Sequence, residues 1–182
     1  MKFRLDTHTH TIASGHAYNT MTEMIKEAAA KGLELIGITE HAPAMPGSCH
    51  EFYFQNLRAV DREELRERYG IMVLLGAELN VMDENGTLDL PEPVFKQLDV
   101  TIASLHLPCL RCRDEKDNTN AVIRAIENPL VDIIGHPDDG RLPLTYEPIV
   151  EAAKKHGKLL EMNDSSLRPG GYRMGADENS RK

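Results

Sequence analysis

The chain has 182 residues, of which 41% are hydrophobic and 27% charged, as in one globular domain that builds its own core. Its formal net charge of −8 argues against a nucleic-acid binder, which would carry a basic face, but it permits a small anionic substrate beside bound cations. No apolar run approaches the roughly 20 residues that span a bilayer, and neither a signal peptide nor a disulfide framework is indicated. We predict a single cytoplasmic domain over residues 1–182, without membrane contact.

Strand-like and helix-like runs alternate along the chain. In chain order, hydrophobic patterning predicts a strand at 3–7, a helix at 22–31 capped by Thr22, a strand at 33–39, a helix at 56–69 ended by Gly70, strands at 71–77 and 100–104, a helix at 118–127, a strand at 131–134, a helix at 145–156 ended by Gly157, and a strand at 158–162. Such repeated units imply an α/β fold with a parallel sheet covered by helices. The irregular stretch at 41–53 is long enough to suggest a functional loop.

The histidines follow the ends of the predicted strands. Of the eight histidines, five lie at the carboxyl end of a strand or just beyond it, namely His8, His10, His41, His106 and His136. Ligands bind at that end of parallel α/β sheets. Glu78 also ends a largely apolar strand, where a buried carboxylate needs a partner such as a metal ion. His16 lies in the loop after the first strand. A lone histidine is more often a satisfied polar residue, but these seven together favour a metal site.

The strongest local signal is the motif Asp6-Thr7-His8-Thr9-His10. Because side chains alternate along a strand, His8 and His10 project to one face and suit a shared metal. Asp6 lies one step deeper and is a candidate for orienting a histidine. Other features keep ordinary interpretations: His50 and His156 as structural residues, and Cys109 and Cys112 as plain thiols, because one CxxC lacks the second pair that a structural zinc site needs.

The ordered motifs resemble those of the PHP (polymerase and histidinol phosphatase) superfamily, and most closely its YcdX-like branch. The segments that carry the likeness are 6–10, His16, 38–41, 76–78, 104–106, 135–137 and 163–166. The resemblance implies a distorted (β/α)7-type barrel with its site at the carboxyl ends of the strands. It also implies up to three divalent ions, described as zinc with manganese or iron in relatives.

The resemblance further implies how the ligands are shared. By motif, His8, His10 and Glu78 would hold the first metal, Glu78, His106 and His136 the second, and His16 and His41 the third. Family members add an Asp-x-His motif after a seventh strand, and no such motif occurs late in this sequence. We therefore expect an incomplete barrel of about six units, cut from a longer parent; a naturally shortened product, or completion by another copy in a homo-oligomer, are the alternatives.

The implied activity is hydrolysis of a small phosphate ester by a phosphatase, in which a metal-bound hydroxide attacks phosphorus. No catalytic residues beyond the metal ligands are expected, since Ser104, Ser165 and Ser166 lack an evident triad. Arg168 is a candidate phosphate contact, because guanidinium groups suit phosphate, although a solvated turn residue is an equal alternative. Two rivals remain open: an amidohydrolase-like metal hydrolase, and a catalytically impaired metal-binding relic.

Overall fold

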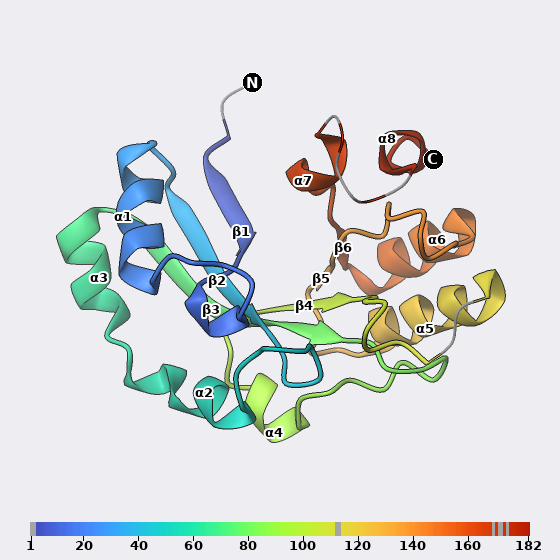
Figure 1. Cartoon of the computed structure of the whole chain (residues 1–182), viewed down its shortest axis with the longest axis horizontal. Coiled ribbons are helices and arrows are strands. Elements are labelled where there is room, and N and C mark those ends of the chain that lie inside the picture. Colours follow the sequence, from blue (N-terminus) through green and yellow to red (C-terminus); the bar gives the residue numbers. More distant parts are fainter. Residues whose placement is uncertain (1–2, 112–113, 169, 171–172, 174) are drawn as a thin grey trace. The chain divides into compact units, whose positions relative to one another are not determined.

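The computed structural model describes residues 3–111, 114–168, 170, 173 and 175–182 (Figure 1). It divides into two compact units, the first comprising Met1–Glu78 and Leu90–Thr101 and the second Leu79–Asp89 and Ile102–Lys182. The predicted single domain over residues 1–182 is not tested by this division and stays a prediction. In the described part of the chain, no helix has the length and apolar character that crossing a bilayer requires.

The first unit is built around parallel strands in the order β1-β2-β3. Its elements are β1 (Leu5–Thr9), the 3-10 turn η1 (Ile12–Ser14), α1 (Met21–Ala30), β2 (Leu35–His41), α2 (Glu51–Asn56), the 3-10 turn η2 (Leu57–Ala59), α3 (Arg62–Tyr69), residues 72–78 of β3 (Met72–Asn80) and α4 (Glu92–Phe95). Helix α1 packs against β2 and α3 (Figure 1). The register places His41 at the end of β2 directly beside Glu78 of β3.

The second unit repeats the same alternation with parallel strands β4, β5 and β6. Its elements are residues 102–104 of β4 (Val100–Ser104), α5 (Glu115–Glu127), β5 (Ile133–Ile134), α6 (Tyr146–His156), β6 (Leu159–Leu160), α7 (Asp164–Leu167) and α8 (Ala176–Asn179). Helices α5 and α6 pack side by side (Figure 1). Their buried residues, among them Ala125, Ile126 and Ile149, form one core with Ala103 and Ile134 from the strands. Parallel strands that alternate with helices confirm the predicted α/β class.

Two helix predictions are corrected by side-chain caps. The helix predicted at 56–69 is interrupted, because Asp61 accepts the N–H of Glu64 and starts α3 afresh. The first helix is capped by Thr20 rather than Thr22. Thr20 and Glu23 form a reciprocal capping box, in which each side chain accepts the other residue's backbone N–H. Residues 57–61, which include η2, therefore connect the two short helices α2 and α3.

Candidate metal centre

The end of β1 directs two imidazoles at one carboxylate oxygen. The Nε2 atoms of His8 and His10 lie 3.2 and 3.3 Å from Oε2 of Glu78. Both rings can reach the same atom because alternate residues of a strand share a face. The carboxylate of Asp6 accepts the backbone N–H of His8 at 3.2 Å, and this hydrogen bond holds the backbone between the two residues.

Glu78 is the centre of this group and is fully buried, with 0% of its surface exposed. A third imidazole comes from its neighbour in the sheet, since His41 Nδ1 lies 2.7 Å from the same Oε2. The backbone also ties these strand ends together, because the N–H of Ala42 donates to the Glu78 carbonyl at 2.9 Å. Three imidazole nitrogens therefore surround one buried carboxylate oxygen.

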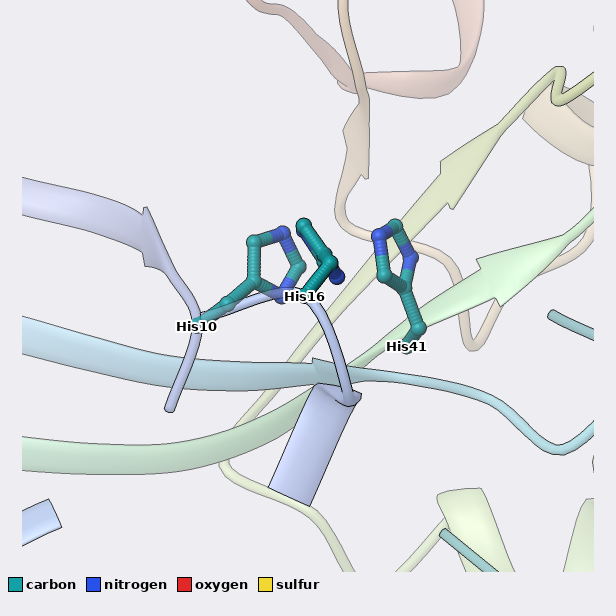
Figure 2. A group of neighbouring side chains, drawn as sticks. All are labelled: His10, His16 and His41. Atoms are coloured by element: carbon teal, nitrogen blue, oxygen red, sulfur yellow. The ribbon is translucent and has the colours of Figure 1, made fainter. Parts of the chain in front are cut away.

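The loop after β1 adds His16 to the group. Turn η1 ends at Gly15, whose φ of 73° lies in the left-handed region that glycine adopts freely. A Cβ atom on Gly15 would lie 2.1 Å from the carbonyl oxygen of Gly47, so this turn sits directly on the loop after β2. The ring centroids of His10, His16 and His41 then lie 4.3 to 5.0 Å apart (Figure 2). The first unit thus brings five of the seven sequence candidates together.

The tautomer of His16 is fixed by the backbone. Its Nδ1 lies 3.1 Å from the carbonyl oxygen of Ser14. A carbonyl oxygen can only accept, so Nδ1 of the neutral ring carries the proton and Nε2 keeps its lone pair. An imidazole in this state can use Nε2 as a metal ligand.

The second unit brings together the remaining two candidates, His106 and His136, with ring centroids 5.2 Å apart. His106 Nδ1 lies 2.7 Å from Oδ1 of Asn80, and the Asn80 amide nitrogen donates to the Asp89 carboxylate at 2.6 Å. Since the Asp89 carboxylate can only accept, it fixes which end of the Asn80 amide faces His106. The Nδ1 of His106 is therefore the donor, and its Nε2 keeps the lone pair that a metal needs.

His136 has an unusual backbone. Its φ of 30° makes it the one non-glycine residue with positive φ in the described part of the chain. Its N–H donates to Oε2 of Glu161 at 2.8 Å, which helps to hold this conformation. The residue is buried, with its ring beside that of His106. Strained backbone of this kind concentrates at functional sites.

The two acids that follow His136 have pKa values shifted in opposite directions. Burial raises the pKa of Asp138, against the opposing hydrogen bond from Ser166 and the charge of Arg173. Burial also opposes ionisation of Asp139, but hydrogen bonds and charge from Arg141 outweigh it and hold the pKa of Asp139 below its usual range. The sequence interpretation did not single out either acid, and no spacing motif marks them.

Other sequence candidates lie outside these groups. Arg168 is exposed and pairs with Asp164 at 2.6 Å, as expected for a solvated turn residue, and its phosphate role stays a prediction. His50 caps α2 by accepting the N–H of Phe52, and His156 ends α6 before Gly157. Cys49 is a free thiol, Cys109 is buried, and Cys112 lies outside the described residues.

The donor set in the first unit fits a divalent cation. Two groups place ligand atoms within 4.8 Å of one another, one made of His8, His10 and Glu78 and the other of His10, His16 and His41. Imidazole nitrogen with carboxylate oxygen is a set that zinc, manganese and iron all accept. A cation among these atoms would also offset the cost of burying the Glu78 charge.

Comparison with known proteins decides the family. The PHP domain family matches residues 6–165. The chain belongs to the PHP family. This membership confirms the resemblance of the ordered histidine motifs.

Relatives of this PHP chain have about half of their aligned residues identical to it. It is 51% identical to a protein of Thermoanaerobacter sp. (strain X514) named as a probable phosphatase, over 98% of this chain and 71% of the relative. It is 46% identical to one of Acetivibrio thermocellus with the same name, over 100% of this chain and 73% of the relative.

Two solved structures share the PHP fold. A histidinol phosphate phosphatase from Lactococcus lactis, described as complexed with zinc, L-histidinol and phosphate, matches with a TM-score of 0.58 at 22% identity, over 90% of this chain and 74% of its own. A structure from Listeria monocytogenes matches with a TM-score of 0.61 at 16% identity, over 97% of this chain and 91% of its own. At these identities the likeness shows the fold, and it confirms the predicted incomplete (β/α) barrel class.

Stability of this PHP chain should depend on pH through Asp139. We expect Arg141→Met to reduce the free energy of unfolding by about 2 kcal/mol at pH 7, because it leaves a buried carboxylate without its charged hydrogen bonds. A lowered pKa stabilises the fold above the unfolded value of about 3.9, and this stabilisation is lost as pH falls through the folded pKa. The difference between variant and wild type should therefore shrink below about pH 4.

Urea unfolding at pH 7 and pH 3.5 measures this difference. Arg124→Met is the matched control, since it breaks an exposed ion pair with Glu127 and should change little. An Arg141→Met penalty that is the same at both pH values would contradict this explanation.

Proposed function

We propose that the chain is a metal-dependent phosphoesterase that hydrolyses a small phosphate ester. The observation that carries the proposal is the convergence of three imidazole nitrogens, from His8, His10 and His41, on one oxygen of the buried Glu78. Family membership and relatives named as probable phosphatases support it. The Lactococcus lactis protein, described as bound to zinc, L-histidinol and phosphate, suggests both a zinc cofactor and a phosphorylated substrate.

The proposed ligands are the seven residues of the sequence motifs, His8, His10, His16, His41, Glu78, His106 and His136. Zinc is the proposed metal, with manganese and iron as alternatives and up to three ions per chain. When bound, such ions polarise phosphoryl oxygens, neutralise developing charge and lower the pKa of water toward about 7. The bound ions would attract a small phosphate ester, because the ester is negatively charged. Their local positive charge would outweigh the net charge of −8 on the chain.

The chain's own residues hold and orient the ligand atoms. Backbone hydrogen bonds at the ends of β2 and β3 fix His41 and Glu78 side by side, so little reorganisation is needed when the site binds a charged ligand. Ser14 and Asn80 hold the rings of His16 and His106 with the proton on Nδ1. Cytoplasmic location and a homo-oligomeric state remain predictions.

Removal of metal should abolish the activity. We expect the purified chain to contain zinc, manganese or iron, to hydrolyse p-nitrophenyl phosphate, and to lose this activity after dialysis against a chelator. Readdition of the metal that elemental analysis found should restore turnover, whereas magnesium alone should not replace it, because imidazole is a poor magnesium ligand.

Three outcomes of this experiment decide between the alternatives. Activity that persists in chelator-treated, metal-free protein would refute metal dependence. A metal-loaded chain that hydrolyses no phosphate ester would refute the phosphoesterase. A chain that binds no metal would refute the proposed metal site and favour a relic without activity.

A further inference from the structure

Glu40 is a fully buried acid, 0% exposed, that precedes His41 on β2. Its carboxylate oxygens accept the N–H and the hydroxyl of Thr11 and the hydroxyl of Ser14. Both hydroxyls donate to this carboxylate, each at 2.5 Å. These donors make a buried negative charge tolerable at this place.

The Ser14 hydroxyl connects Glu40 to His10 and His41 by hydrogen bonds. A serine hydroxyl has one proton to donate and two lone pairs that accept. The proton goes to Glu40 Oε2 at 2.5 Å, and one lone pair accepts the N–H of His41 at 3.0 Å. The second lone pair faces Nδ1 of His10 at 3.2 Å. This contact therefore favours the neutral His10 ring that donates from Nδ1, against the pull of the Glu78 carboxylate on an Nε2 proton.

With its proton on Nδ1, His10 has a lone pair on Nε2, and this atom lies 3.3 Å from Glu78 Oε2. We propose that Glu40 is a positioning residue that acts through Ser14, holding His10 in the Nδ1–H tautomer and so keeping its Nε2 lone pair available beside Glu78. Residues that hydrogen-bond to the far nitrogen of a metal-binding imidazole fix its tautomer in this way. The effect on metal affinity rests on the proposed function, whereas the tautomer itself does not.

A purely structural role for Glu40 would be to tie the loop after β1 to β2. Glu23 provides the matched comparison, because its carboxylate also accepts both the N–H and the hydroxyl of a threonine, Thr20, at 2.7 and 2.8 Å. Glu23 belongs to the capping box of α1. Glu23→Gln therefore removes the same kind of acceptor without altering the contact between Ser14 and Glu40.

The test is the tautomer of each histidine in 15N-labelled, metal-free protein at about pH 8.5, where imidazoles are neutral. Two-bond 1H–15N correlation spectra distinguish Nδ1–H from Nε2–H rings. We expect Nδ1–H for His10 and His16 in the wild type. In Glu40→Gln the new amide can donate to Ser14, whose hydroxyl then donates to His10 and moves its proton to Nε2. His16 should stay Nδ1–H, because it faces a carbonyl oxygen.

Ser14→Ala is the second variant, and it should leave His10 as a mixture of tautomers. Zinc affinity, measured by competition with a chromophoric chelator, should fall about 10- to 100-fold in Glu40→Gln and Ser14→Ala and stay unchanged in Glu23→Gln. Thermal unfolding identifies the variants that fold.

Three results would overturn the proposal: an Nε2–H ring at His10 in the wild type, an unchanged His10 in both folded variants, or the same change in Glu23→Gln. Even if both variants fail to fold, the wild-type spectrum can overturn the proposal, because it shows whether the His10 proton is on Nδ1 or Nε2. A tautomer change in a chain that hydrolyses no phosphate ester would refute the proposed function and support this inference.

Discussion

Glu78→Gln should reduce metal content to near zero and abolish phosphatase activity. The substitution keeps the size of the side chain but removes the charge that three imidazoles surround. Its effect on zinc affinity should exceed the roughly 10- to 100-fold that loss of a ligand's hydrogen-bond partner typically causes. Elemental analysis of the purified variant and hydrolysis of p-nitrophenyl phosphate measure the two effects.

His41→Ala provides the comparison for Glu78→Gln. It removes one imidazole and leaves His8 and His10 beside the carboxylate, so metal content and activity should fall less. Cooperative thermal unfolding of both variants is the control for folding. If Glu78→Gln kept wild-type metal content and turnover, the central role of this carboxylate would be refuted.

Gly15→Ala should destabilise the first unit by on the order of 3–5 kcal/mol. Two effects combine: the backbone is left-handed, with φ of 73°, and the added Cβ would lie 2.1 Å from the carbonyl oxygen of Gly47. Both loops would have to move apart, and His16, the next residue, would move with them. Urea unfolding of metal-free protein measures the change in the free energy of unfolding.

Gly70→Ala separates the two effects. Gly70 has a nearly identical φ of 68°, but, its chain neighbours apart, no atom of the described residues lies within 4 Å of the position that its Cβ would take. Its substitution should therefore show the backbone cost alone, about 1 kcal/mol. If both variants lost the same stability, the close approach of the two loops would be unimportant.

The sequence predicts the order of the elements well and their boundaries less well. The strand at 100–104 and the end of the helix at 156 match the structure, because continuous apolar runs and a glycine after a helix are local signals. The helix predicted at 56–69 is interrupted because Asp61 caps a new helix in the middle of an amphipathic pattern. Capping of this kind depends on one side-chain rotamer, which a hydrophobic pattern does not contain.

Most of the candidate ligands were accessible from the sequence because they lie at or just beyond strand ends, and strand ends can be located from apolar runs. Glu40, Ser14 and Asn80 were not found. Ser14 and Glu40 are 26 residues apart, and Asn80 and His106 are also 26 residues apart, so only the folded register brings each pair together. Ordinary serines and asparagines carry no spacing signal that would distinguish these from turn residues.

Because His136 has a positive φ, the residue that would be most stable at this position is glycine, which lacks the imidazole. A glycine would adopt this backbone freely, whereas a residue with a Cβ bears a cost of about 1–3 kcal/mol. Directed evolution that selects for heat resistance alone would therefore tend to exchange this imidazole for glycine and enrich stable proteins that lack one proposed metal ligand. Any such library needs a parallel screen for turnover.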